Sequence, residues 1–286
     1  MSSWIHLRFL RYLGYVACTL LSACGQSLES PNPQQASNDQ PADTIVHCGR
    51  LIDGLSDGAR LDQSIHIRGD RIVRIEARGS TQPLTNQTVI HDLNAFTCLP
   101  GLINTHVHFD GNPEDSADYG VYARRTHDET LQLILDNART TLLTGFTTVR
   151  HVGAWFPDAV YRARELIETG QATGPRIHTA GPYLTIPGGG GDLTFPEISL
   201  EDIPAESQQG IASTPEEFAA RAEAAIAAGA DFLKVIASGA VFSVGTAPGA
   251  PEMTRADIEA VVAVAKRHGK KVTAHVHSDQ SGQDAI

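Results

Sequence analysis

The segment at residues 99–110 constrains the fold of this chain more than any other. It reads Leu-Pro-Gly-Leu-Ile-Asn-Thr-His-Val-His-Phe-Asp, an apolar run that begins at a Pro-Gly turn and contains His106 and His108 near its end. Residues two apart on a strand point to the same side, so both imidazoles face the same way. They form either a metal-binding pair or two partly exposed histidines at a strand end. We expect a buried strand whose polar carboxyl end lies where parallel α/β folds build their sites.

After His108, strand-like and helix-like patterns alternate. The strand patterns cover 146–153, 176–181, 231–237 and 271–277, and the helical patterns cover 126–143, 158–169, 214–228 and 254–268. This alternation predicts a parallel sheet with right-handed crossovers. With the segment at 99–110 there are five strands, whereas a complete TIM-type barrel has eight strands in about 250 residues. We therefore expect an α/β fold that forms an incomplete (β/α)8 barrel over residues 99–286. The long loop at 182–213 is either an active-site lid or a flexible insertion.

Residues 43–98 show a different pattern, with short β-rich runs at 44–47, 64–68, 71–75 and 89–93. Gly69 and Asp70, between two of these runs, form a tight-hairpin sequence. We expect a small β-sandwich-like domain that precedes the barrel. His47, His66 and His91 lie in this domain, and we interpret them as structural or surface residues.

The N-terminus has the layout of a secretory signal peptide at residues 1–23. Arg8 and Arg11 precede an apolar run at 12–21 that is too short to span a bilayer as a mature helix. Residues 21–24, Leu-Ser-Ala-Cys, resemble a bacterial lipobox, so we expect lipidation of Cys24; an ordinary signal peptide or an uncleaved anchor is the alternative. Residues 24–42 predict a disordered tether. The expected location is the periplasmic face of a bacterial outer membrane, with the lipid as the membrane contact.

The net charge bears on the class of binding partner, and the cysteine content bears on disulfide formation. The formal net charge is −11, and an acidic chain is a poor match for nucleic acid. Cys18 lies in the signal peptide and Cys24 in the lipobox, which leaves Cys48 and Cys98. In an oxidising compartment these two either form a disulfide or remain as two unpaired core cysteines.

Lys234 is unusual because apolar residues surround it in the run Phe-Leu-Lys-Val-Ile. Lysine is rarely buried without a partner. One interpretation is a lysine near a strand end whose amine reaches water. The other is an amine whose pKa is lowered by burial, so that the neutral amine can add CO2 and become an anionic carbamate.

Several segments together resemble the amidohydrolase superfamily. The segment at 99–110 resembles the first barrel strand of that superfamily, with Asn104 in place of the usual Asp. Segments at 145–150, 174–176, 229–239 and 274–277 resemble the branch of imidazolonepropionase-like proteins and Xaa-Pro dipeptidases, in which the fourth strand carries a carboxylated lysine. The resemblance runs from about residue 45 to the end of the chain. His151 stands where that branch commonly has Asp, and Gly190 where it commonly has His.

The resemblance implies a metal-dependent hydrolase of carbon–nitrogen bonds in amides, cyclic amides or dipeptides. His106 and His108 would bind the more buried metal ion, His275 would bind a second ion, and carboxylated Lys234 would bridge the two. Zinc is the default metal for such a site. A metal-activated hydroxide would attack the substrate carbonyl. His277, on the same strand face as His275, either contacts the substrate or its oxyanion, or has a supporting or surface role outside the reacting groups.

The resemblance also implies residues that are absent from this sequence. The sixth-strand His of the family and its eighth-strand Asp have no counterpart here, so the catalytic acid–base residue is unknown. The alternative function is therefore an inactive truncated lipoprotein, a pseudoenzyme remnant of such a hydrolase. A third reading is a protein that binds metal through its histidines alone. Five strands of a parallel sheet would also leave an unpaired edge and an uncovered core.

Overall fold

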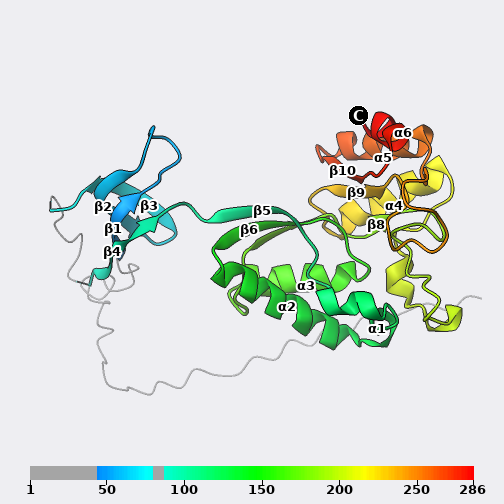
Figure 1. Cartoon of the computed structure of the whole chain (residues 1–286), viewed down its shortest axis with the longest axis horizontal. Helices are drawn as coiled ribbons and strands as arrows, with labels where there is room; N and C mark the ends of the chain where they lie inside the picture. Colours follow the sequence, from blue (N-terminus) through cyan, green and yellow to red (C-terminus); the bar gives the residue numbers. More distant parts are fainter. Residues whose placement is uncertain (1–43, 80–86) are drawn as a thin grey trace, which may run out of the picture. The chain divides into compact units, whose positions relative to one another are not determined.

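The computed structural model describes residues 44–79 and 87–286, and contacts divide the chain into two units, Met1–Cys98 and Leu99–Ile286 (Figure 1). The expected signal peptide at 1–23, the lipidated Cys24 and the tether at 24–42 lie outside the described residues. Within the part of the chain that the structure describes, no helix has the length and apolar character needed to span a membrane.

Four strands form one mixed sheet in the first unit. They are β1 (Thr44–Leu51), β2 (Arg60–Arg68), β3 (Arg71–Ala77) and β4 (Val89–Cys98), in the order β3-β2-β1-β4. β2 and β3 form the antiparallel hairpin that the Gly-Asp turn predicts, and β1 pairs parallel to β4. The sequence predicted a sandwich-like domain, but the described residues of this unit contain a single sheet. Short β-rich runs predict strands without specifying the number of layers.

Cys48 and Cys98 form a disulfide that links β1 to β4, with their Cα atoms 5.9 Å apart. The parallel pairing of these strands brings Cys98 opposite Leu51, close to Cys48. The disulfide alternative is therefore the one that the structure contains.

The three histidines of the first unit have the structural or surface positions that we expected. His66 is fully buried on β2, and its Nε2 lies 3.0 Å from a carboxylate oxygen of Glu76. His47 Nδ1 lies 2.8 Å from Ser64 Oγ, and His91 is exposed.

All strands of the second unit run parallel. They are β5 (Leu102–Val107), β6 (Phe146–His151), β7 (Arg176–Thr179), β8 (Tyr183–Leu184), β9 (Leu233–Ile236) and β10 (Val272–His275). They form the sheets β5-β6-β7 and β10-β9-β8. The five strands predicted from the sequence are all present as β5, β6, β7, β9 and β10, and β8 is a short additional strand that follows β7.

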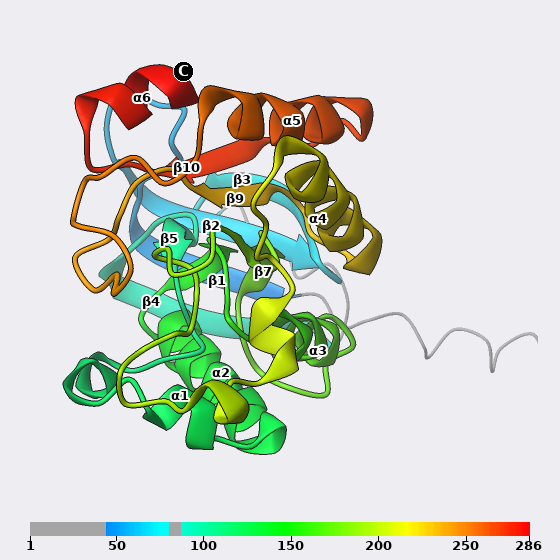
Figure 2. The same ribbon diagram turned by 90° about the vertical axis from the view of Figure 1, so that its right-hand side faces the viewer.

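Helices cover the outer side of these sheets. They are α1 (Val121–Arg124), α2 (His127–Leu143), α3 (Pro157–Glu168), α4 (Pro215–Ala228), α5 (Arg255–Arg267) and α6 (Asp279–Ala285). α2 and α3 lie along β5 and β6 (Figure 1), and α5 lies along β10 (Figure 2). The side chains of Thr126, Thr214 and Thr254 cap α2, α4 and α5 by accepting a backbone N–H. The four helices that the periodicity predicts are all confirmed. α1 and α6 are too short for a periodic pattern.

β5 differs from the buried strand that the sequence predicted. Leu102 is 42% exposed and Ile103 is 64% exposed. β5 and β10 are outer strands, and in the described structure each pairs with a neighbour on one side only. Val149 on β6 and Val235 on β9 are fully buried by comparison. An apolar sequence predicts that a strand can be buried, but burial also requires a neighbouring element to cover it.

The long loop at 182–213 is packed into the second unit. It contains β8 and two short 3₁₀ helices, η3 (Leu200–Asp202) and η4 (Ala205–Gln208). Leu193, Phe195 and Ile198 are buried in the same core as α2 and α3. This packing does not support the flexible-insertion interpretation.

Candidate functional site

The carboxyl ends of β5, β9 and β10 bring the predicted site residues to one cavity. His106, His108, Lys234, His275 and His277 all line this space of about 450 Å³, which we call the histidine cavity. His106 lies on β5, Lys234 on β9 and His275 on β10, while His108 and His277 follow the ends of their strands. The strand-end positions explain why residues distant in sequence meet here.

The two histidines of the first strand face each other. His106 Nε2 lies 3.3 Å from His108 Nε2. His108 donates its Nδ1–H to the carbonyl oxygen of Gly153 at 3.0 Å, which leaves a lone pair on Nε2. Burial lowers the pKa of His108 to about 4 and also lowers the pKa of His106. Both rings are therefore neutral at pH 7.

Lys234 and His275 are neighbours on adjacent strands. The Lys234 side chain is 4% exposed, and burial together with the nearby Arg150 charge lowers its pKa to about 8. A lysine pKa lowered by burial is what the second interpretation of the Phe-Leu-Lys-Val-Ile run expects. His275 Nε2 is buried and has no hydrogen-bond partner among the residues that the structure describes. Burial and the Lys234 charge lower the pKa of His275 to about 4.

The histidine nitrogens of this cavity are suitable ligand atoms for a divalent cation. His106 Nε2 and His108 Nε2 lie 3.3 Å apart, with the donor set by the tautomers, and His275 Nε2 is buried without a hydrogen-bond partner among the described residues. The ring nitrogens of neutral imidazoles are common metal ligands. Over residues 44–79 and 87–286, however, no three His, Cys, Asp or Glu side chains form a cluster that could hold a metal. The described His, Cys, Asp and Glu side chains therefore do not by themselves form a complete ligand set.

Tyr183 and Gly153 are site residues that the sequence analysis missed. The Tyr183 hydroxyl lies 2.9 Å from His108 Nδ1. Gly153 has φ +112, and a Cβ there would lie 2.4 Å from the Tyr183 ring and 3.3 Å from Lys234 Cγ. Only glycine allows this close approach. The position of Tyr183 directly after a predicted strand was the available signal for its role.

His151 lies behind the histidine pair and does not line the cavity. Its Nε2 accepts a hydrogen bond from the backbone N–H of Phe109 at 2.9 Å, and its ring centroid is 5.9 Å from that of His108. Burial holds its pKa well below the usual value. Burial also raises the pKa of the neighbouring Asp110 to about 6. His151, which stands where the resembling branch commonly has Asp, is thus a neutral side chain that packs behind the histidine pair.

Glu252 fixes the glycine-rich segment that borders the cavity. Its two carboxylate oxygens accept the backbone N–H of Gly190 at 2.9 and 3.0 Å, and one accepts the Thr246 hydroxyl at 2.5 Å. Gly190 lines the histidine cavity, and a Cβ there would lie 2.9 Å from Ser243 Oγ. A histidine at this position has no space in the present arrangement.

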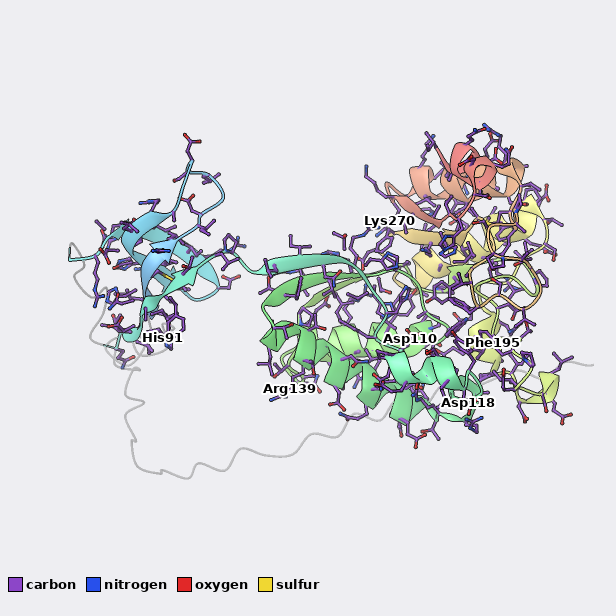
Figure 3. All side chains as sticks on the ribbon, in the orientation of Figure 1. His91, Asp110, Asp118, Arg139, Phe195 and Lys270 are labelled. Carbon is purple, nitrogen blue, oxygen red and sulfur yellow. A yellow bond between two sulfur atoms is a disulfide. The ribbon has the colours of Figure 1, made fainter. Side chains whose placement is uncertain are left out.

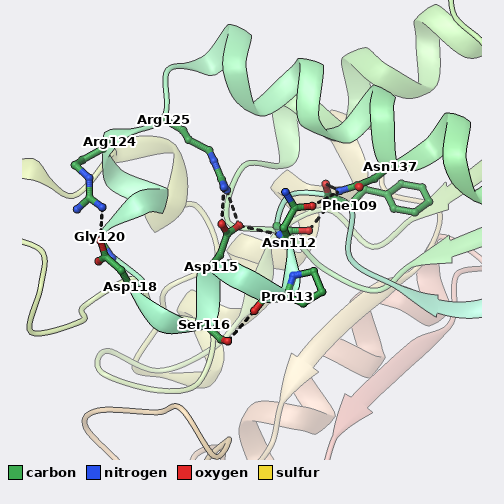
Figure 4. A network of polar contacts seen from close by, with 11 residues as sticks. Phe109, Asn112, Pro113, Asp115, Ser116, Asp118, Gly120, Arg124, Arg125 and Asn137 are labelled. Atoms are coloured by element: carbon green, nitrogen blue, oxygen red, sulfur yellow. Dashed lines mark hydrogen bonds and ion pairs between the residues drawn. The ribbon is translucent and has the colours of Figure 1, made fainter.

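A polar network shapes the loop after β5 (Figure 4). Asp115 accepts two hydrogen bonds from the Arg125 guanidinium, at 2.6 and 2.8 Å, and one from the backbone N–H of Asn112 at 2.8 Å. Asn137 on α2 donates to the Phe109 carbonyl at 3.0 Å. The loop is therefore attached to the helix that follows it.

Comparison with known proteins identifies proteins of similar sequence and similar fold. Ochratoxinase from Aspergillus niger is 26% identical over an alignment of 289 positions, which covers 96% of this chain and 58% of that protein. The crystal structure of an Xaa-Pro dipeptidase with methionine bound in its active site has a TM-score of 0.76 and 31% identity, and covers 85% of this chain and 59% of that one. The A. niger ochratoxinase structure has a TM-score of 0.72 and 22% identity, over 86% of this chain and 58% of that one, which is a likeness of fold.

The chain therefore spans less than two thirds of the length of these relatives. Their folds confirm the partial α/β barrel that was predicted. The family model described as "Amidohydrolase family" matches residues 97–286, which is more than half of the sequence and includes every residue of the candidate site. This chain belongs to the amidohydrolase family.

Proposed function

We propose that this protein hydrolyses carbon–nitrogen bonds of small amides or dipeptides, using divalent metal held in the histidine cavity. The observation that carries the proposal is the convergence of three neutral imidazoles and a buried amine at the strand ends. The similarity to an Xaa-Pro dipeptidase and to an ochratoxinase supports the reaction class.

In this proposal the four metal-binding residues have separate roles. His106 and His108 would hold one ion, and His275 would hold a second. The neutral Nζ of Lys234 would bond to the carbon of CO2 and release a proton, which gives a carbamate whose two oxygens can bridge the ions. A divalent ion, zinc by default, supplies Lewis acidity that makes water a nucleophile at neutral pH and polarises a carbonyl.

The remaining residues would orient the substrate. The backbone N–H of His277 donates to Ser238 Oγ at 2.7 Å, and the His277 ring lies 4.6 Å from the His275 ring. His277 is therefore held at the cavity wall, where it can contact the substrate. Burial raises the pKa of Tyr183 well above its usual value, so the hydroxyl stays protonated and available as a hydrogen-bond donor.

The direct test is hydrolysis of a panel of N-acyl amino acids and Xaa-Pro dipeptides by the purified protein with zinc and bicarbonate. We expect turnover that a chelator abolishes and that zinc restores. His106→Asn should lose at least 100-fold in kcat/KM, whereas His91→Asn, an exposed histidine of the first unit, should change little. Stoichiometric metal binding without turnover of any substrate would instead support the inactive alternative.

We also propose that the protein is exported and anchored through a lipid on Cys24. The signal-like residues 1–23 and the lipobox-like residues 21–24 support this. Radiolabelled palmitate should enter the parent protein and not the Cys24→Ser variant. Equal labelling of both proteins would contradict the proposal.

A further inference from the structure

A second cavity adjoins the histidine cavity. It has a volume of about 430 Å³ and shares His108, Tyr183 and Phe242 with the first cavity. Both volumes are in the range of sites for small molecules, about 300–1,000 Å³. A ligand that reaches the histidines can therefore extend into this neighbouring space.

Aromatic side chains dominate one wall of the second cavity. The chain contains nine Phe, six Tyr and two Trp, yet Tyr119, Tyr122, Trp155, Tyr183 and Phe242 all line this one space. The Tyr122 and Trp155 rings meet edge to face with centroids 4.6 Å apart, and Trp155 lies 5.8 Å from Tyr183. We call these five residues the aromatic wall.

Hydrogen bonds and packing fix the aromatic wall in place. Trp155 donates its indole N–H to the Gly191 carbonyl at 3.0 Å, and its backbone N–H donates to Asp110 at 3.2 Å. Tyr119 stacks on Phe195 with centroids 4.3 Å apart. Asp110 and Phe195, which support the wall from two loops, are labelled in Figure 3. Phe242, at 36% exposed, is the side of the wall that is open to solvent.

We infer that the second cavity binds a neutral aromatic group of the substrate while the carbon–nitrogen bond lies at the histidines. This inference deepens the proposed function and rests on it for the position of the reacting bond. A preformed wall of edge-on and face-on rings favours binding of a planar ring. Pairs of aromatic rings are stabilised by more than the burial of their surface area alone. The shared residues His108 and Tyr183 place the two cavities within reach of one molecule.

The first test measures binding, so that it does not depend on turnover. Trp155 is the tryptophan of the aromatic wall, and the other, Trp4, lies in the proposed signal peptide. In protein that begins at residue 24, tryptophan fluorescence therefore reports on the wall. The probes are N-acetyl-L-phenylalaninamide and N-acetyl-L-alaninamide, titrated into the zinc-loaded protein. We expect the aromatic probe to bind at least tenfold more tightly and to change the Trp155 emission.

Variants of Phe242, at the open side of the wall, test the inference further, and a variant of its neighbour Val241 is the control. Phe242→Ala should reduce the affinity ratio of the two probes to threefold or less, and Phe242→Leu should restore only part of it. Val241→Ala, a neighbour that is 77% exposed and does not line the cavity, should keep the full ratio. Equal affinity for both probes in the parent protein, or the same ratio in Phe242→Ala, would overturn the inference.

Hydrolysis of matched substrates separates this inference from the proposed function. Benzoylglycine is compared with acetylglycine, and acetylphenylalanine with acetylalanine, because the ring can lie on either side of the reacting bond. Turnover without an aromatic preference in either pair would overturn the inference and keep the proposed function. Selective binding of the aromatic probe without turnover would support the aromatic site and contradict the hydrolase.

Discussion

At the scale of single residues, the most informative side chain is Lys234. It is buried at 4% exposure, and its pKa is lowered to about 8. It lies beside His275, whose Nε2 has no hydrogen-bond partner within residues 44–79 and 87–286. A buried lysine without a carboxylate partner is costly unless its amine is neutral or modified. In the proposed function, Lys234 has the role of a metal ligand in the histidine cavity.

Replacing Lys234 should therefore remove metal. We expect Lys234→Ala to fall from two bound ions to one or none, since the bridging ligand is lost. Elemental analysis of dialysed protein measures this, and Lys266→Ala, an exposed lysine in the last turn of α5, is the control. Unchanged metal content in Lys234→Ala would show that this lysine is not a ligand.

At the scale of elements, two loops define the cavities, and buried carboxylates hold both. Asp115 holds the loop after β5 through Arg125, and Glu252 holds the glycine-rich segment through Gly190. Both carboxylates are nearly buried, at 8% and 7% exposure. Their hydrogen bonds are charge-assisted and thus stronger than neutral ones.

The Asp115–Arg125 pair should make stability depend on pH. Burial opposes ionisation of Asp115, but its hydrogen bonds to Arg125 and Asn112 outweigh this and lower its pKa. A carboxyl whose pKa is lower in the folded than in the unfolded state adds stability above about pH 4, and this stability is lost as the pH falls through the folded pKa. Asp115→Asn should therefore cost about 2 kcal/mol from pH 7 down to about pH 4, and progressively less as the pH falls further.

Thermal unfolding of the parent and variant between pH 7 and pH 3 measures this difference. Asp118→Asn is the matched control, because Asp118 pairs with Arg124 in the same loop but both side chains are more than half exposed. Exposed pairs contribute at most about 1 kcal/mol. A destabilisation by Asp115→Asn that stays constant with pH would contradict the assignment.

Removing the Glu252 carboxylate should release the glycine-rich segment. In Glu252→Ala the Gly190 amide loses its acceptor, so we expect a cost of about 2 kcal/mol and faster hydrogen exchange at that amide. Glu259→Ala, on the exposed side of α5, should leave exchange unchanged. Equal protection of the Gly190 amide in the Glu252→Ala and parent proteins would show that other contacts hold this segment.

At the scale of the whole molecule, the disulfide between Cys48 and Cys98 links strands separated by 50 residues in sequence. A cross-link of this length stabilises a protein by about 4 kcal/mol, mainly by restricting the unfolded chain. The Cys48→Ser/Cys98→Ser double variant should show faster hydrogen exchange across β1. Dithiothreitol should have the same effect on the parent and none on the double variant. Slow exchange of β1 in reduced protein would contradict this.

The sequence was sufficient to predict those features of the fold that the local residue pattern determines. Period and capping residues were sufficient for the helices that begin after Thr126, Thr214 and Thr254. The resemblance to the amidohydrolase superfamily was needed to predict that Lys234 lies with His106 at one site, and both line the histidine cavity. The sequence could not predict the exposure of β5 or the single sheet of the first unit, because these depend on which elements lie alongside. Tyr183, Glu252 and the aromatic wall were missed for the same reason.

The proposed hydrolysis requires that His106, His108, Lys234 and His275 hold divalent metal. Anomalous diffraction at the zinc absorption edge, from crystals of the protein grown with zinc and bicarbonate, tests it most directly. We predict a peak about 2.0–2.1 Å from the Nε2 atoms of His106 and His108, a second at the same distance from a His275 nitrogen, and added density on Lys234 Nζ. Zinc bound elsewhere, with Lys234 unmodified and these histidines unliganded, would contradict the account.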